Sequence, residues 1–277
     1  MPQLTFDNIK DVINNLCLMN NQFMNKMLED NKPAAEIMLR VILKNDKIKV
    51  KNVRVQDFIQ NLYGHSAQLD ILAQDENGRY FNVEVQRNDE GAPPKRARFY
   101  SSILDMHFLK PGKAYEDLPE SYVIFITEND VLQENLPLYS VDRIVKENNK
   151  TFADGSHIVY VNSTCQDDTP LGKLMQDFYC TNPDNLNYKE FSERMMFLKS
   201  AKEGKKEMID PIEIYANNKA EKAAAKAAKK ATITAEYARS AQIAQRLLED
   251  GESAERTARL TNLSIEDVRK LAEKLSA

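Results

Sequence analysis

Two short β-prone segments, 67–74 and 79–86, constrain the fold of this chain more than any other feature. They flank the turn sequence D-E-N-G, and because Asn and Gly tolerate positive φ this pattern predicts an antiparallel hairpin. The hairpin carries Asp70 on its first strand and Glu84 on its second. Two carboxylates on neighbouring strands can bind Mg²⁺, which takes oxygen ligands and needs only one or two protein carboxylates.

The length of the turn decides whether the two carboxylates share one face of the sheet. A two-residue turn at the Asn-Gly dipeptide would pair Asp70 with Val85, and Glu84 would then point to the opposite face. An odd-numbered loop or a bulge pairs Asp70 with Glu84 instead, and we predict this second register. Gln86 follows Glu84 by two residues, so its amide should face the same side as the Glu84 carboxylate.

Helix-like and strand-like segments alternate along the rest of the first 210 residues. Apolar residues recur with near-helical spacing over 7–44, interrupted at 31–33, where Pro33 suits the first turn of a second helix. We expect further helices at 93–109 and 170–202. We expect further strands at 48–55, 121–127 and 157–161. This order predicts an α/β fold with a mixed sheet flanked by helices.

The composition changes sharply at about residue 215. Segment 217–230 is rich in Ala and Lys and lacks Gly and Pro, so it is strongly helix-prone. The end of the chain reads as three short helices, and Ser264 with Asp267 resembles a capping box at the start of the last one. We divide the chain into a domain at 1–210, a helical linker at 211–240 and a small helical tail at 241–277.

Composition excludes several classes of protein. The net charge of −4 means that nucleic-acid binding would need local basic patches. Three cysteines without C-x-x-C spacing favour a reducing compartment over a disulfide framework or a zinc site, and three widely separated histidines argue against a histidine-centred site. No apolar run reaches transmembrane length and no signal pattern opens the chain, so we expect a cytoplasmic protein with no membrane partner.

The acidic hairpin resembles the core of the PD-(D/E)XK nucleases, and more narrowly the PD-(D/E)XK family transposases, also called recombination-promoting nucleases. The resemblance runs in order through FMNKMLEDN and AEIMLRVIL, the hairpin LDILAQDENGRYFNVEVQ, the segment 95–119 and the segment 247–268. It implies an α/β fold with a restriction-endonuclease-like core, in which helices flank a mixed sheet, and an all-α C-terminal tail.

The same resemblance implies hydrolysis of DNA phosphodiester bonds with Mg²⁺. Asp70 and Glu84 would hold the metal with the backbone carbonyl of Val85, and Glu36 matches the position of an acid that sometimes completes the site. Gln86 takes the place of the usual lysine. It cannot carry a charge and can only orient a water by hydrogen bonds, although the narrower family often carries E-x-Q.

Three residues of the expected helix at 93–109 are candidates for DNA binding. Arg96 and Arg98 could grip phosphate and Tyr100 could stack on a base. A solvated helix face explains the two arginines equally well, and core packing explains Tyr100. The corresponding plain reading of Asp70 and Glu84 is a pair of solvated acids on an exposed sheet face.

The leading hypothesis is therefore a Mg²⁺-dependent DNA endonuclease associated with transposition or recombination. One alternative is a weak or inactive DNA-binding or regulatory relic of the fold, since Gln86 replaces lysine. Another is a scaffold that forms a homo-oligomer through its helical tail. A helix that begins near Ser264 would suit a helix-turn-helix, but its acids largely cancel its cations, which slightly favours a self-associating bundle.

Overall fold

The computed structural model describes residues 11–59, 67–87 and 91–275. The chain divides into two compact units, residues 1–213 and residues 214–277. The first unit holds the strands β1 (Val50–Ile59), β2 (Ala67–Asp75), β3 (Tyr80–Gln86), β4 (Ser121–Thr127), β5 (Leu138–Val141), β6 (Ile144–Val145), β7 (Lys150–Thr151) and β8 (Ser156–Asn162). Its helices are α2 (Asn21–Leu28), α3 (Lys32–Leu43), α4 (Pro94–Phe108), α5 (Pro170–Tyr179), α6 (Lys189–Ser200) and α7 (Lys202–Glu207), with short 3₁₀ turns at Tyr115–Asp117 and Pro183–Asn185.

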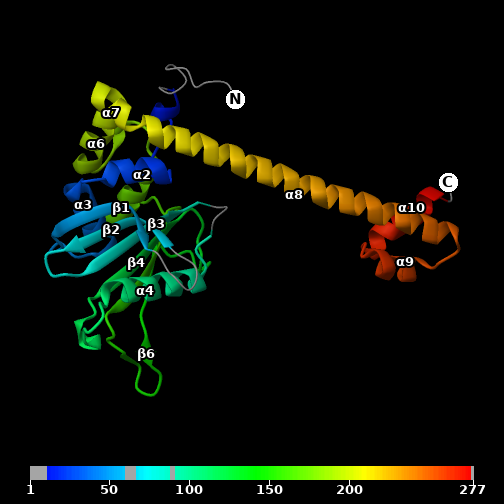
Figure 1. Ribbon diagram of the computed structural model, residues 1–277, viewed down its shortest axis with the longest axis horizontal. Helices are drawn as coiled ribbons and strands as arrows, with labels where there is room; N and C mark the ends of the chain where they lie inside the picture. The colour runs from blue at the N-terminus through cyan, green and yellow to red at the C-terminus, as the bar shows by residue number, and fades with distance from the viewer. Residues whose placement is uncertain (1–10, 60–66, 88–90, 276–277) are drawn as a thin grey trace. The chain divides into compact units, whose positions relative to one another are not determined.

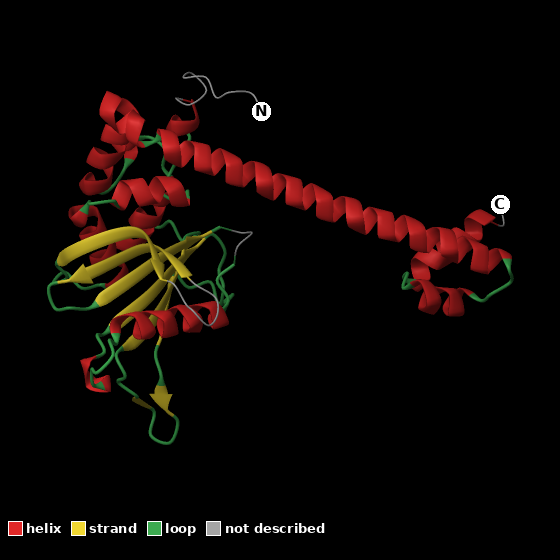
Figure 2. Cartoon of the chain, in the orientation of Figure 1, coloured by secondary structure: helices red, strands yellow, loops and turns green. Residues whose placement is uncertain are grey.

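A mixed sheet of six strands forms the centre of the first unit, in the order β1-β2-β3-β4-β8-β5 (Figure 1). The strands β1, β2 and β3 pair antiparallel, β3, β4 and β8 pair parallel, and β5 returns antiparallel to β8. The parallel step from β3 to β4 needs a crossover connection, and α4 supplies it. The small β6–β7 hairpin stands apart from this sheet (Figure 2).

Helices cover both faces of the sheet. One face packs against α2, α3, α5 and α6, in a cluster that includes Phe23, Met38 and Ile124. The other face packs against α4, in a cluster that includes Leu104 and Phe125. The apolar run of β4 is buried on both faces because its alternate residues join the two clusters, as expected for a central parallel strand.

The predicted mixed sheet flanked by helices is confirmed. The short strands β5, β6 and β7 were not predicted. The expected helix at 170–202 is wrong in one respect, since α5 ends at Tyr179 and a 3₁₀ turn precedes α6. Asn182 and Pro183 explain the break: the Asn182 side chain accepts a hydrogen bond from the Asp184 N–H, and proline cannot continue the preceding helix.

The second unit consists of helices. α8 (Ile209–Glu249) begins in the first unit and continues without a break through residue 240, where a new helix was expected. Its sequence from 212 to 249 contains neither Gly nor Pro, so nothing in it stops helix propagation. α9 (Ala254–Thr261) and α10 (Ile265–Leu275) follow, and Asn262 between them has φ +57°.

The helix starts of this unit agree with the sequence. The Ser253 side chain accepts a hydrogen bond from the Arg256 N–H and caps α9. The Ser264 hydroxyl accepts from the Asp267 N–H at 3.1 Å and donates to the Asp267 carboxylate, so the predicted capping contact is present. Within the described ranges, none of the helices is both long and apolar enough to cross a membrane.

Candidate active site

The register of the β2–β3 hairpin places the two candidate carboxylates opposite each other. Ile71 pairs with Val83, and the strands are joined by a loop over 75–79 that has an odd number of residues. One step further along the same register, Asp70 faces Glu84. The prediction of an odd-numbered loop is confirmed, and the two carboxylates lie on adjacent strands at the same level of the sheet.

A buried aspartate fixes the length of this loop. Asp75 is 1% exposed, and its Oδ1 accepts hydrogen bonds from the backbone N–H groups of Asn77 and Arg79. The Arg79 guanidinium binds Oδ2 through Nε at 2.8 Å and Nη2 at 2.7 Å. Gly78 supplies the positive φ of +82° that closes the turn. These contacts hold the register on which the site depends.

The two strands separate at the carboxylates. The backbone pairing of β2 with β3 ends at Ile71. Beyond it, the Asp70 N–H donates to Glu84 Oε1 at 3.1 Å, and the Val85 N–H donates to Asp70 Oδ2 at 3.4 Å. Each carboxylate therefore accepts from the backbone of the other strand. The pair occupies the gap between the strand ends.

The strand β2 also changes face at this point. Ile71 belongs to the cluster under α2, α3, α5 and α6, whereas Leu69, also an odd-numbered residue of β2, belongs to the cluster under α4. On the edge strand β1, the residue between the partners of Ile71 and Leu69 is Gln56, which has φ +52°. A non-glycine residue in this region marks local distortion of the backbone. Asp70 thus lies at the position where β2 changes face.

The Glu84 carboxyl is held in an unfavourable electrostatic environment. Glu84 is 1% exposed, while Asp70 is partly exposed. Burial raises the pKa of Glu84 well above its usual range, and the nearby negative charge of Asp70 raises it further; the Asp70 N–H and Arg96 offset only part of this. Burying two carboxylates together is costly unless a cation compensates them.

Gln86 and Arg96 complete the α4 side of the site. Gln86 is 2% exposed and its Oε1 accepts a hydrogen bond from Arg96 Nη1 at 2.8 Å. Arg96 Nη2 lies 3.8 Å from Glu84 Oε2. Val85 is buried between Glu84 and Gln86 in β3. The structure therefore brings together Asp70 of β2, the predicted residues Glu84, Val85 and Gln86 of β3, and the predicted residue Arg96 of α4.

Asn21 was not predicted from the sequence. It begins α2, and its Nδ2 donates to Asp70 Oδ1 at 3.3 Å. The sequence near it is rich in asparagine, but nothing in that local pattern indicates which amide reaches the hairpin. The contact depends on tertiary packing of α2 against β2, 49 positions further along the chain.

The structure does not bring Glu36 to the pair. Its Oε2 accepts from the Val50 N–H at 2.8 Å and its Oε1 lies 2.6 Å from Arg40. Val50 pairs with Asp75, which is five residues along β2 from Asp70, or about 16 Å at the rise of an extended strand. Glu36 therefore fixes the start of β1 to α3, at the far end of the hairpin.

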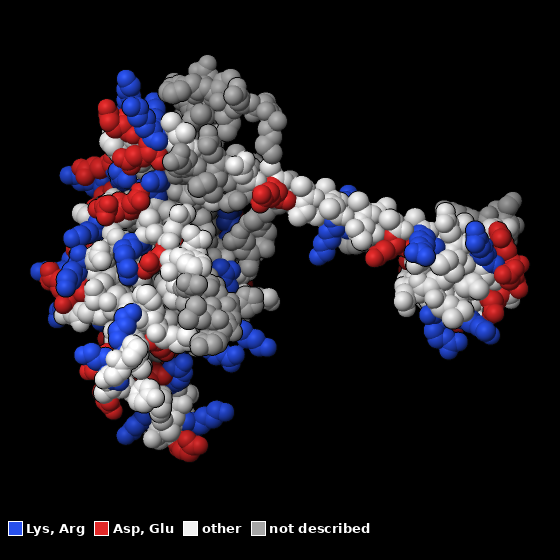
Figure 3. Space-filling model, viewed as in Figure 1, with Lys and Arg blue, Asp and Glu red and all other residues white. Residues whose placement is uncertain are grey.

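The two other candidates on α4 lie in different environments. Arg98 is exposed, as a solvated helix face or a DNA contact requires. Tyr100 is 8% exposed and packs edge-on against Phe125 at 5.9 Å between ring centroids, which favours core packing. On the face of the first unit drawn in Figure 3, described Lys and Arg residues are interspersed with Asp and Glu.

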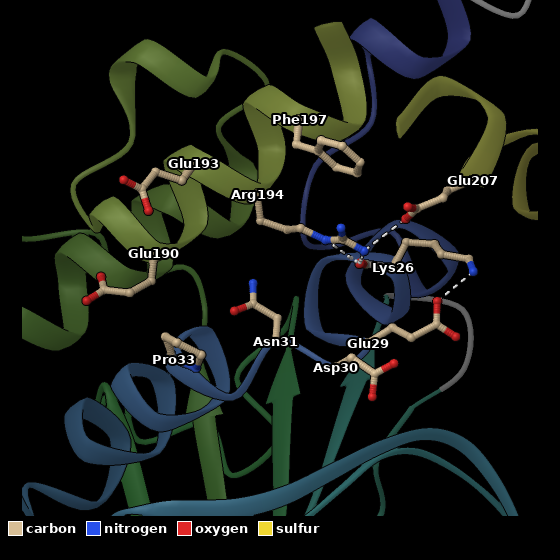
Figure 4. A pocket seen from close by; sticks show the side chains of 10 residues that line it. All are labelled: Lys26, Glu29, Asp30, Asn31, Pro33, Glu190, Glu193, Arg194, Phe197 and Glu207. Atoms are coloured by element: carbon tan, nitrogen blue, oxygen red, sulfur yellow. Dashed lines mark hydrogen bonds and ion pairs between the residues drawn. The ribbon is translucent and has the colours of Figure 1, made fainter. Parts of the chain in front are cut away.

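A separate hollow of about 610 Å³ lies away from these residues, among α2, α3, α6 and α7 (Figure 4). Arg194 crosses it, bound to the Lys26 carbonyl at 2.9 Å and to Glu207 Oε2 at 3.0 Å. Lys26 is in turn paired with Glu29 at 2.6 Å. Both cations that line the hollow, Arg194 and Lys26, are thus paired with acids that also line it. We therefore do not treat the hollow as a candidate active site.

The donor set at Asp70 and Glu84 fits a hard divalent cation. In the described ranges, no three His, Cys, Asp or Glu side chains form a group suited to a metal. Two carboxylates with backbone oxygen nearby still satisfy Mg²⁺, which keeps several of its own waters. A cation here would also offset the repulsion between the two acids. The predicted pair therefore offers the small number of protein oxygens with which Mg²⁺ can be bound.

Comparison with known proteins gives one family. A sequence model of the PD-(D/E)XK nuclease family transposases matches residues 27–257, which is most of the chain. The match includes the whole hairpin and α4, and it extends into α9. No curated protein and no solved structure matches the chain.

Proposed function

The chain belongs to the PD-(D/E)XK nuclease family transposases, and from this premise we propose that it is a Mg²⁺-dependent DNA endonuclease. The observation that carries the proposal is the opposition of Asp70 and Glu84 where β2 and β3 separate. Two solvated acids on an exposed face would not explain this arrangement, because Glu84 is buried. A buried carboxyl beside a second acid, with its pKa raised, is typical of functional sites, and a cation would compensate both charges.

The residues of the site have distinct tasks in this proposal. Asp70 and Glu84 hold the metal, with the carbonyl oxygen of Val85 as a further ligand. When bound, the cation would lower the pKa of a water and offset charge on the phosphate. Asn21 orients the Asp70 carboxylate through the bond to Oδ1, and backbone N–H groups hold Asp70 Oδ2 and Glu84 Oε1.

Binding of DNA would use α4 and the surfaces beside it. Arg98 is exposed on α4 and we assign it a phosphate contact, which positions the duplex without reading its sequence. Tyr100 supports the site from within the core rather than by stacking on a base. The net charge of the chain is −4, so affinity should depend on few phosphate contacts and fall only moderately with salt.

Nicking of supercoiled plasmid tests the proposal. We expect the intact chain to nick DNA with Mg²⁺ and to be inactive in EDTA, and we expect Asp70→Ala and Glu84→Ala each to reduce the rate at least about 100-fold. The matched control is Glu147→Gln, which changes an exposed glutamate of the β6–β7 turn and should leave the rate unchanged. Cleavage that survives both alanine substitutions would remove this pair as the active site.

The second unit favours self-association over DNA reading. Two cations of α10 are already paired: Arg269 with Glu255 at 3.3 Å and Lys270 with Glu266 at 2.8 Å. Leu260 and Ile265, near the α9–α10 turn, are exposed at 58% and 38%. We infer that this unit contributes to assembly of copies of the chain, as the bundle alternative predicts, and that DNA is bound by the first unit.

A further inference from the structure

An arginine of α4 stands beside both the buried carboxylate and the buried amide of the proposed site. Arg96 Nη2 lies 3.8 Å from Glu84 Oε2, and Nη1 donates to Gln86 Oε1 at 2.8 Å. The Arg96 side chain is 29% exposed. Its guanidinium is therefore part of the wall of the site, in contrast to the exposed guanidinium of Arg98 two residues later.

The position of this guanidinium is fixed from several sides. Nη1 also donates to the Gly91 carbonyl at 3.1 Å, and Nη2 donates to the Tyr100 hydroxyl at 3.2 Å. The group lies over the ring of Tyr100 at 5.4 Å and over the ring of Phe125 at 5.8 Å. Phe125 is the β4 residue paired with Glu84. A charge held this way needs little reorganisation during a reaction.

The contact with Arg96 also determines which end of the Gln86 amide lies against the guanidinium. A guanidinium has only donors, so the Gln86 atom against it must be the carbonyl oxygen. The amide NH₂ is then the end that remains to donate to a water or a phosphate oxygen. An N–H donor with a positive charge behind it is what a lysine side chain would provide at this position.

We propose that Arg96 is a positioning residue that acts through Gln86: it orients the amide as a donor and supplies the positive charge that Gln86 lacks. This rests on the proposed nuclease function and replaces the simpler reading of Arg96 as a phosphate contact. Two residues would thus share the task of one lysine, with the donor on β3 and the charge on α4.

Removing the positive charge at position 96 and placing one at position 86 tests the proposal. The variants are Arg96→Gln, Gln86→Lys and the double variant, and the matched control is Lys95→Gln, which removes one charge from the same turn of α4 but from an exposed side chain. Single-turnover cleavage with Mg²⁺, measured as a function of protein concentration, separates the rate at saturation from the affinity for DNA.

We expect Arg96→Gln to reduce the saturated rate about 100-fold with little change in affinity. The double variant Gln86→Lys with Arg96→Gln should recover to within about tenfold of the wild type, and Lys95→Gln should leave the rate unchanged. Loss of affinity at an unchanged rate in Arg96→Gln would overturn the proposal and restore the phosphate contact. A double variant no faster than Arg96→Gln would overturn it too.

A second measurement does not depend on cleavage. Calorimetric titration with Mg²⁺ in the absence of DNA should show about fivefold tighter binding to Arg96→Gln than to wild type, because a positive charge beside Glu84 has been removed. Gln86→Lys in that background should reverse the change. If the wild type does not cut DNA, the nuclease proposal fails while this titration still decides the role of Arg96. Equal Mg²⁺ affinity in wild type and Arg96→Gln would overturn the proposed role of Arg96.

Discussion

At the scale of single residues, the site is a compromise between stability and function. Glu84 is buried next to Asp70, and burial raises its pKa because the charged form is poorly solvated. Asp75, on the same hairpin, is equally buried but is neutralised by Arg79. Of these two buried acids, Asp75 has a cation at 2.7 Å, whereas Arg96 lies 3.8 Å from Glu84, so we expect them to have opposite effects on folding.

This contrast predicts opposite effects of two conservative substitutions. Glu84→Gln removes the charge and keeps an oxygen for the Asp70 N–H, so it should raise the thermal midpoint while abolishing cleavage. Asp75→Asn weakens the pairing with Arg79 and should lower stability by about 1–3 kcal/mol. Thermal unfolding in metal-free buffer measures both. A midpoint lowered by Glu84→Gln would mean that Glu84 is a structural acid.

Lys199 offers a pH-dependent test of packing at the residue scale. Its Nζ donates to the carbonyls of Asn14, Leu16 and Thr181 at 3.0, 2.6 and 2.6 Å, which ties α6 to two connecting segments. Burial lowers the pKa of Lys199 from its ordinary 10.5 to about 8. Between these two values the unfolded chain binds more protons than the folded one, so stability rises with pH.

We therefore expect the stability difference between wild type and Lys199→Met to grow by about 2 kcal/mol from pH 8 to pH 10, in favour of wild type. Denaturant unfolding at several pH values measures it, and taking the difference cancels the titration of other groups. A difference that stays constant over this range would show that Lys199 titrates normally in the folded protein.

At the scale of elements, the sequence was informative wherever local chemistry decides the structure. The hairpin, the buried strand β4, α4 and the capping contact at Ser264 follow from turn residues, apolar runs and helix-start patterns. The strands β5, β6 and β7 have four residues or fewer, too short for a periodic signal. The face change at Asp70 depends on the distortion at Gln56, which no local pattern reveals.

The candidate site divides in the same way. The level of Asp70 relative to Glu84 is predictable because an odd-numbered loop sets the pairing, and Gln86 shares the face of Glu84 because side chains two apart on a strand do so. Asn21 and the inward role of Arg96 depend on how two helices pack against the hairpin, and sequence alone cannot give that packing. Glu36 shows the opposite outcome. Its position along the chain matches that of an acid in the resembling family, but the fold places it at the far end of the hairpin from Asp70.

At the scale of the whole molecule, two compact units share α8. If the first unit carries the chemistry and the second assembles copies of the chain, residues 1–213 alone should retain the single-turnover cleavage rate within about threefold. The truncated chain should be a monomer by light scattering wherever the full chain is an oligomer. Loss of cleavage in a truncated chain that is still folded by circular dichroism would place part of the site in the second unit.

The most direct test of the account is the single-turnover cleavage rate of supercoiled DNA as a function of Mg²⁺ concentration, for wild type, Asp70→Asn and Glu84→Gln. These two substitutions keep the shape of the side chains and remove only their charge. We expect a saturable dependence on Mg²⁺ in wild type and a rate at least about 100-fold lower in each variant at every concentration. Cleavage by wild type in EDTA, or by both variants at the wild-type rate, would contradict it.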